Sequence, residues 1–160
     1  MKTKNVFLSI LGTIVFSGSF SYSLAAQEQR SQLEILASYE WHNYLPEYEV
    51  LDIYIYTEDE LNISSYLFKH SLEQHNTYPF YLSDEPDKEF DESKVGKAQN
   101  GKYIVFKDKN SRAKVDEIRT LNDEELVLKS MSVYVGGWKP RRYIAKEKTG
   151  DNQVLNTIIK

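Results

Sequence analysis

Short segments in which apolar and other side chains alternate constrain the fold of this chain more than any other feature. In residues 49–56 (EVLDIYIY), Leu51, Ile53 and Ile55 fall on one side of a strand, and the tyrosines fall on the other. Similar segments follow about every 10–14 residues, at 61–70, 102–106, 126–128 and 138–145. No long helical segment separates them. The chain is therefore predicted to be all-β, an antiparallel β-barrel or sandwich of about eight strands.

The two ends of this β-rich region show helical spacing instead. Residues 27–37 are predicted to begin a short helix. The tail, residues 149–160, repeats apolar residues four positions apart, as Val154 and Ile158 illustrate. This spacing favours a last helical turn that docks on the domain.

Residues 1–25 have the pattern of a secretory signal peptide. Lys2 and Lys4 precede an uncharged, mostly apolar run (VFLSILGTIVF), and Ser23 and Ala25 supply the small residues that a signal peptidase recognises. The run is shorter than the roughly 20 residues that cross a bilayer as a helix, so we expect no membrane span. A buried N-terminal helix is the alternative, but polar residues follow Ala25 at once. The pattern predicts export to the periplasm or the extracellular space.

Composition excludes several classes of protein. The absence of cysteine from all 160 residues excludes disulfides, a thiolate nucleophile and zinc sites with sulfur ligands. The net charge of −4 becomes −6 once Lys2 and Lys4 leave with the leader, which argues against nucleic acid as a partner. We expect residues 26–160 to form a single, monomeric domain. We also expect no cofactor, because no phosphate-binding or nucleophile motif is present.

Two stretches and one tryptophan resemble a known family. Residues 81–106, and residues 115–128 with their Asn-Asp turn and Leu-Val-Leu strand, are similar to segments of small exported bacterial lipocalin-like proteins. Trp41 lies where such proteins carry a tryptophan on their first strand, although Tyr39-Glu40 precedes it in place of Gly-x. The resemblance implies an antiparallel barrel and brings no catalytic residues with it.

Aromatic residues are the most unusual part of the composition, with 12 Tyr, 7 Phe and 2 Trp. Alternation sets Tyr54 and Tyr56 opposite Ile53 and Ile55, so the strand is apolar on both faces. A strand of this kind needs two buried surfaces. The tyrosines are interpreted either as core or as the lining of a cavity or partner-binding face. Our candidate ligand-binding residues are Tyr54, Tyr56, Asp52, Tyr66, Phe68, Trp138 and Arg142.

Two of these candidates are polar residues in apolar surroundings. Asp52 interrupts the tyrosine side of its strand, so its carboxylate needs a partner, an opening, or a place at a strand end. Arg142 shares a strand face with Trp138, which favours a cation–π pair or a carboxylate partner inside the barrel. The alternative for Arg142 is a charged edge strand that discourages association.

The three histidines give little support for a metal site. His70, Glu73 and His75 do not share one helix face, and we place this segment in a solvated loop. No metal ligands are therefore assigned.

The function expected from these residues is that of an exported, non-enzymatic binding module. Its partner is predicted to be a small amphipathic molecule held in an aromatic-lined cavity. The alternative is a protein-interaction, inhibitor or immunity-type protein that uses an exposed aromatic or acidic face.

Overall fold

The computed structural model describes residues 30–131 and 139–148. The expected leader, the tail 149–160 and Trp138 lie outside the described residues. None of the helices in the described ranges is long and apolar enough to cross a membrane.

The described residues form eight antiparallel strands that close into one barrel, in which each strand pairs with its sequence neighbour and the last pairs with the first. The barrel, rather than the sandwich, is thus the architecture. The strands are β1 (Tyr39–Leu45), β2 (Val50–Tyr56), β3 (Glu60–Leu67), β4 (Leu72–Ser83), β5 (Tyr103–Lys107), β6 (Ala113–Leu121), β7 (Glu125–Ser130) and β8 (Arg141–Glu147).

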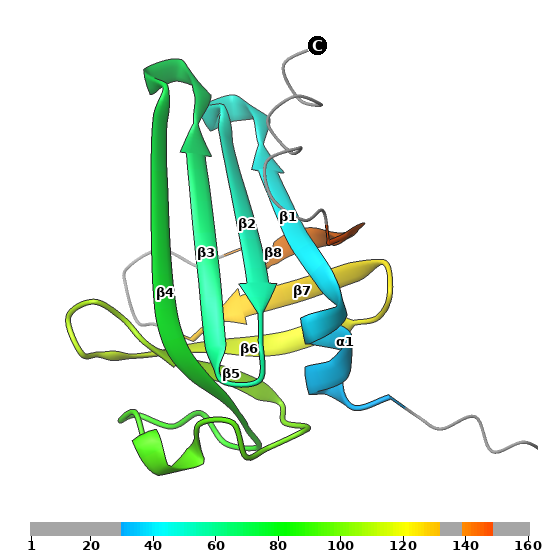
Figure 1. Ribbon diagram of the computed structural model, residues 1–160, viewed down its shortest axis with the longest axis vertical. Coiled ribbons are helices and arrows are strands. Elements are labelled where there is room, and N and C mark those ends of the chain that lie inside the picture. The colour runs from blue at the N-terminus through cyan, green and yellow to red at the C-terminus, as the bar shows by residue number, and fades with distance from the viewer. Residues whose placement is uncertain (1–29, 132–138, 149–160) are drawn as a thin grey trace, which may run out of the picture.

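The strands differ in length and direction, which gives the barrel one extended wall. Strands β1 to β4 run along the long axis of the molecule, and β6 to β8 cross behind them (Figure 1). Strand β4 changes its partner part-way: it pairs with β3 as far as Pro79 and with β5 from Phe80 onward. The upper part of β4 therefore has a described partner on one side only.

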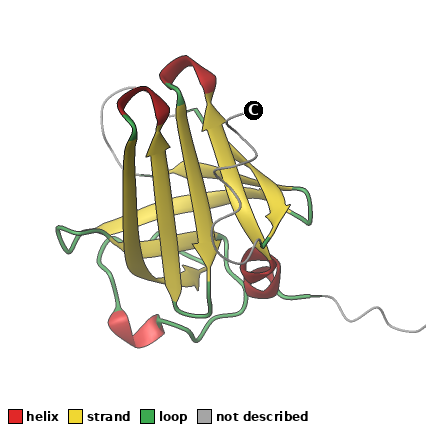
Figure 2. Cartoon of the chain, turned by 45° about the horizontal axis from the view of Figure 1, so that its top comes forward, coloured by secondary structure: helices red, strands yellow, loops and turns green. Residues whose placement is uncertain are grey.

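The β1–β2 and β3–β4 hairpins have tips of the same design. Each contains a 3-10 turn, η1 (Pro46–Tyr48) or η2 (Phe68–His70), followed by a left-handed residue, Glu49 with φ 52° or Ser71 with φ 48°. The Phe68 amide donates to the Glu49 carbonyl across 3.0 Å and joins the two tips, which lie side by side in Figure 2.

This tip corrects the prediction of a loop around His70 and His75. His70 lies in η2, whereas His75 lies within β4, where its ring contacts the Ser64 hydroxyl at 2.8 Å and the Glu73 carboxylate at 2.7 Å. The described residues contain no group of three or more metal-ligating side chains.

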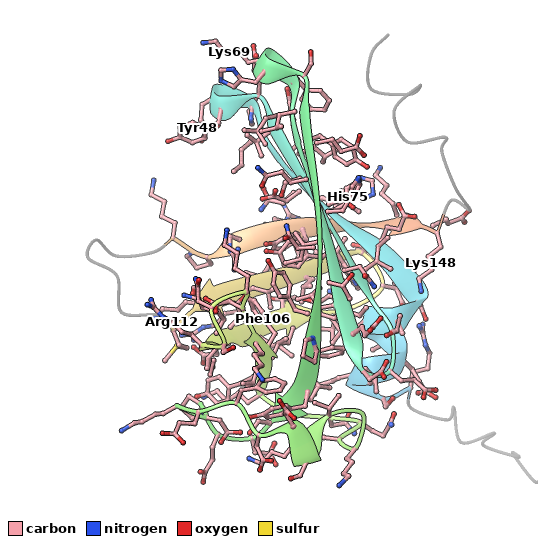
Figure 3. All side chains as sticks on the ribbon, turned by 60° about the vertical axis from the view of Figure 1, so that its left-hand side comes forward. Tyr48, Lys69, His75, Phe106, Arg112 and Lys148 are labelled. Atoms are coloured by element: carbon pink, nitrogen blue, oxygen red, sulfur yellow. The ribbon has the colours of Figure 1, made fainter. Side chains whose placement is uncertain are left out.

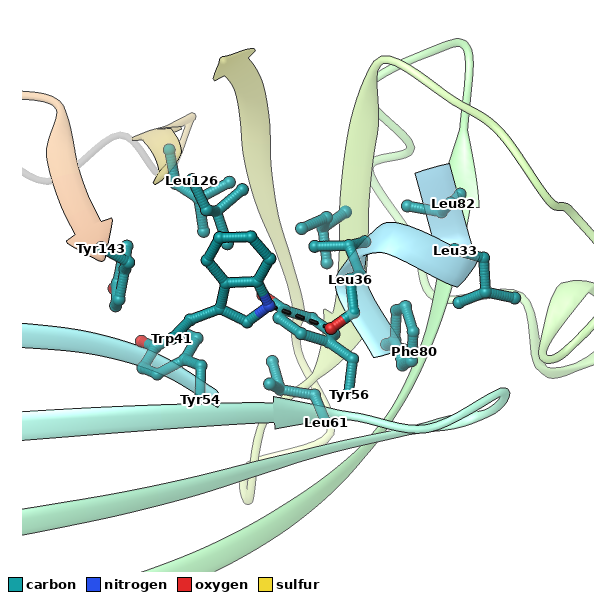
Figure 4. Packing of buried hydrophobic residues seen from close by; sticks show 12 residues of the cluster. Leu33, Leu36, Trp41, Tyr54, Tyr56, Leu61, Phe80, Leu82, Leu126 and Tyr143 are labelled. Carbon is teal, nitrogen blue, oxygen red and sulfur yellow. Dashed lines mark hydrogen bonds between the residues drawn. The ribbon is translucent and has the colours of Figure 1, made fainter. Parts of the chain in front are cut away.

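Helix α1 (Gln32–Ser38) covers the other end of the barrel. Ser31 begins it with a capping box, in which its hydroxyl accepts from the Glu34 amide and the Glu34 carboxylate accepts from the Ser31 amide. Leu33 and Leu36 point from the helix into the barrel and are almost fully buried (Figure 4). The short N-terminal helix predicted from the sequence is therefore present, although it begins later than residue 27.

The main core fills the barrel next to α1. Trp41 lies at its centre, and its indole Nε1 donates to the Leu36 carbonyl across 2.9 Å (Figure 4). Tyr54 and Tyr56 belong to this core, while Ile53 points the other way, so the predicted alternation of β2 is confirmed. The remaining buried members come from the other strands: Leu61, Phe80, Leu82, Ile104, Leu126, Leu128 and Tyr143.

A smaller cluster lies outside the β4–β5 wall. Tyr81, Tyr103 and Val105 are buried there against Phe90 and Val95 of the connection between β4 and β5. The connection returns to β5 through Gly101, where a Cβ would lie 2.6 Å from the backbone nitrogen of Ser83. Only glycine allows this close approach.

Replacing Leu128 by alanine tests the inward face of β7. The side chain is 1% exposed within the main core, so Leu128→Ala is expected to lower the free energy of unfolding by about 2–5 kcal/mol. Val127→Ala, on the opposite face of the same strand, is the matched control and is expected to cost less than about 1 kcal/mol. Urea unfolding midpoints measure both, and equal midpoints would contradict the register of β7.

Candidate functional site

The interior of the barrel becomes polar on the side away from α1. Asn43 of β1 lies directly across from Asp52 of β2, and both side chains point inward. Ser65 of β3 donates its hydroxyl to the Asp52 carboxylate across 2.6 Å. Asp52 therefore has the hydrogen-bond partner that its place in an apolar strand required.

A recess of about 600 Å³ opens in this polar half, and each strand from β3 to β8 contributes to its lining. One side of the recess is apolar and is formed by Ile63, Tyr78 and Phe106. The other side is charged, and its members are Asp108, Lys109, Lys114, Asp116 and Arg141. We call this cavity the Arg141 recess. Figure 3 shows Phe106 at the level where the long hairpins meet the crossing strands.

Arg141, at the first position of β8, is held on three sides. One guanidinium nitrogen donates to the Asp116 carboxylate at 2.9 Å, and another donates to the Tyr54 hydroxyl at 3.2 Å. Its Cζ lies 5.9 Å from the ring centroid of Tyr143. The Asp116 side chain is 4% exposed and that of Arg141 is 35% exposed, so the cation faces the recess and the anion lies behind it.

The protonation of this pair follows from its surroundings. Burial raises the pKa of the Asp116 carboxyl, and the neighbouring Arg141 opposes that rise. Burial lowers the pKa of Arg141, but Tyr143, Tyr54 and Asp116 outweigh this effect, and the pKa is raised. Arg141 is therefore a permanent cation and a fixed hydrogen-bond donor, which suits it to binding an acceptor rather than to transferring a proton.

Two tyrosines in the barrel interior have buried hydroxyls whose removal from water is not compensated by a hydrogen bond. The hydroxyls of Tyr56 and Tyr143 are buried and make no hydrogen bond of ordinary geometry. Burial raises the pKa of both phenols well above the usual value of 10.0. Packing of their rings offsets part of this desolvation cost. The ring centroid of Tyr143 lies 4.7 Å from that of Tyr54, and the ring centroid of Tyr56 lies 5.2 Å from that of Phe80.

The structure brings only some of the predicted site residues together. Asp52, Tyr54 and Tyr56 point into the barrel, and the Tyr54 hydroxyl reaches Arg141. Tyr66 points outward from β3 and lies 6.1 Å from the His75 ring, while Phe68 lies in the η2 tip. These last two residues do not contribute to the Arg141 recess.

Arg142 lies on the outer face of the barrel. Its guanidinium pairs with the Glu125 carboxylate on the neighbouring β7, and its side chain is 68% exposed. The expected carboxylate partner exists, but the pair is outside the barrel rather than inside it. The interpretation of Arg142 as part of a charged, exposed strand fits this position.

The sequence reasoning missed the residues that form the charged side of the recess. Alternation already placed Arg141 on the same strand face as Tyr143, and that was the available signal. Nothing in the sequence pointed to Asp116 or Lys114, because their inward direction depends on the pairing of β6 with β5.

Comparisons with protein families, with curated proteins and with solved structures find no match for this chain. The eight-stranded antiparallel barrel is nevertheless consistent with the lipocalin-like fold that the resemblance implied.

Two conservative substitutions distinguish the contributions of the Tyr56 and Tyr54 hydroxyls to the free energy of unfolding. Tyr56→Phe removes a buried hydroxyl that has no partner, so it is expected to keep or raise the free energy of unfolding, by up to about 2 kcal/mol. Tyr54→Phe removes the acceptor of an Arg141 hydrogen bond and is expected to lower it by about 1 kcal/mol. Urea unfolding measures both, and a larger loss for Tyr56→Phe than for Tyr54→Phe would contradict this geometry.

The raised tyrosine pKa values predict a loss of stability in alkali. Above pH of about 10, tyrosines of the unfolded chain release protons that Tyr56 and Tyr143 retain in the fold. The free energy of unfolding is therefore unaffected by these two tyrosines below this pH. Above it, the free energy of unfolding falls by about 1.4 kcal/mol per pH unit for each buried tyrosine.

Urea midpoints between pH 9 and pH 11.5 measure this loss. The slope is expected to be shallower in Tyr56→Phe and unchanged in Tyr48→Phe, because the Tyr48 side chain is 68% exposed. Identical slopes in all three proteins would show that Tyr56 titrates normally.

Proposed function

We propose that this protein is an exported binding protein that holds a small amphipathic acid in the Arg141 recess. The observation that carries the proposal is the pairing of a fixed guanidinium with an apolar wall in one cavity. A volume of about 600 Å³ lies within the range of pockets that bind small molecules.

The two sides of the recess suit the two parts of such a ligand. A carboxylate binds a guanidinium through paired, charge-assisted hydrogen bonds, and Asp116 already fixes the orientation of Arg141. Lys114 adds a second positive charge on the same side, and the Asp108 carboxylate lies 3.7 Å from its ammonium group. The hydrocarbon or aromatic part of the ligand packs on Ile63, Tyr78 and Phe106, which removes it from water.

Export is part of this proposal and is supported by the leader pattern of residues 1–25. A non-enzymatic role is supported by the chemistry of the recess, since the Arg141 guanidinium stays protonated at neutral pH and does not serve as a general acid or base.

The neighbouring arginines of β8 provide a matched test. Arg141→Gln is expected to weaken binding of anilinonaphthalene sulfonate, an anion with aromatic rings, by about 10–100-fold, the loss of one charge-assisted interaction. Arg142→Gln, on the outer face, is expected to leave binding within about twofold. Fluorescence titration of the mature protein measures both, and long-chain carboxylates are expected to compete with the dye.

A second variant protects the test against misfolding, because Arg141→Gln leaves the buried Asp116 without its cation. Lys114 lies on the same side of the recess and is only partly buried. Lys114→Gln is expected to weaken binding of the anionic dye by a smaller factor than Arg141→Gln. Binding of uncharged phenylnaphthylamine serves as the control for the apolar wall. Equal affinity for the anionic dye in all variants would reject the recess as the site.

A protein partner is the second candidate function, and the hairpin tips favour it. Tyr44, Tyr48 and Leu72 are 54%, 68% and 44% exposed near these tips. Figure 3 shows Tyr48 and Lys69 at the far end of the long hairpins, away from the barrel core. A partner that binds there would be lost in Tyr48→Ser, whereas dye binding in the recess would persist.

A further inference from the structure

An anion bound in the Arg141 recess shares its guanidinium with a carboxylate of the protein. Arg141 donates one hydrogen bond to the Asp116 carboxylate at 2.9 Å and one to the Tyr54 hydroxyl at 3.2 Å. An arginine has further N–H groups beyond these two, and the Arg141 side chain is 35% exposed. A ligand acceptor can therefore reach the guanidinium only as a second anion beside Asp116.

The two anions would lie close together. Acceptors on the same or adjacent nitrogens of one guanidinium are about 3–6 Å apart. Like charges at this distance disfavour the ionised form of one of them, as in carboxylate pairs that share a site. Water screens this repulsion little on the protein side, because the Asp116 side chain is 4% exposed.

The other charged groups of the recess do not remove this conflict. Lys114 already has the Asp108 carboxylate 3.7 Å from its ammonium group, and Lys109 is exposed, so water screens its charge. The remaining titratable groups around Asp116 and Arg141 are phenols, which are neutral below pH of about 10. They are Tyr54, Tyr56, Tyr78 and Tyr143.

Building on the proposed function, we infer that the recess takes up its anion together with a proton, which Asp116 binds. A protonated Asp116 keeps a carbonyl oxygen that accepts from Arg141, so the orientation of the guanidinium is retained. The Ser130 hydroxyl, which hydrogen-bonds to this carboxyl, can accept the new O–H. Asp116 is thus the residue that sets the charge the recess presents to a ligand.

The surroundings of Asp116 already favour its neutral form. Burial raises the pKa of the carboxyl before any anion binds, although Arg141 opposes the rise. Asp108, the other carboxylate of the recess, behaves differently. Burial acts to raise its pKa as well, but hydrogen bonds from the amides of Arg112 and Asn110 outweigh this effect, and its pKa is lowered.

The sign of the pH dependence follows from linkage. A bound anion raises the pKa of Asp116, so the anion binds more tightly where Asp116 is protonated, and affinity increases as pH falls. Anilinonaphthalene sulfonate isolates this effect, because its sulfonate stays ionised in mild acid. Its affinity is expected to be about 3–30-fold higher at pH 4.5 than at pH 7.5, measured by fluorescence titration.

The two carboxylates of the recess provide a matched pair of variants. Asp116→Asn keeps an oxygen acceptor for Arg141 but removes the charge. Its dye affinity is expected to be at least about threefold above that of the unaltered protein at pH 7.5, and to change less than about twofold with pH. In Asp108→Asn the increase towards acid is expected to persist, because Asp108 stays ionised in this range. The histidines are the same in both variants.

Calorimetry of dye binding to the unaltered protein keeps the test independent of variants that fail to fold. Binding heats at pH 5 in two buffers of different ionisation enthalpy count the protons taken up, expected to be about 0.3–1 per dye. Dye binding without proton uptake would overturn the inference and leave the proposed function standing. So would an equal pH dependence in Asp116→Asn, or for uncharged phenylnaphthylamine. Dye binding that does not depend on Arg141 at any pH would instead reject the recess itself.

Discussion

The hydrogen bond from the Trp41 indole to the Leu36 carbonyl joins helix α1 to the barrel that it covers. Trp41 is fully buried, and its nitrogen would be an unpaired donor in an apolar core without this acceptor. The bond is available only when α1 ends just before β1 begins, so the capping box at Ser31 and the start of the first strand are linked. The side chains in the apolar half of the barrel are almost fully buried because this end is covered.

A covered end determines where polar chemistry is placed. Since Leu33 and Leu36 occupy the interior next to α1, charged groups are confined to the opposite half. There the cost of removing the Arg141–Asp116 pair from water is offset in three ways. The two groups form a hydrogen bond of 2.9 Å, the Tyr54 hydroxyl is a second acceptor, and the guanidinium stays partly exposed. The same exposure makes the guanidinium accessible from the recess. Structural support and the proposed ligand recognition thus lie at different ends of one barrel.

The sequence predicted local features well and long-range features poorly. Alternation correctly placed Tyr54 and Tyr56 opposite Ile53, because side-chain direction in a strand depends only on neighbours in the chain. Closure of the barrel depends on the pairing of β8 with β1, which no local pattern encodes. For the same reason the Arg141–Tyr54 contact, which joins residues 87 positions apart, could not be anticipated. The β4 position of His75 was missed because its neighbours are polar on both faces.

The change of partner along β4 leaves the backbone of residues 72–79 bonded to β3 on one side, with no described strand on the other. An open strand edge of this length is a template for pairing with another chain, and so a route to aggregation. The side chains here oppose that outcome: Glu73, Gln74, His75 and Asn76 are exposed, and Pro79 supplies no amide hydrogen. The long wall of the barrel therefore extends beyond the closed part with an edge whose side chains disfavour pairing with another strand.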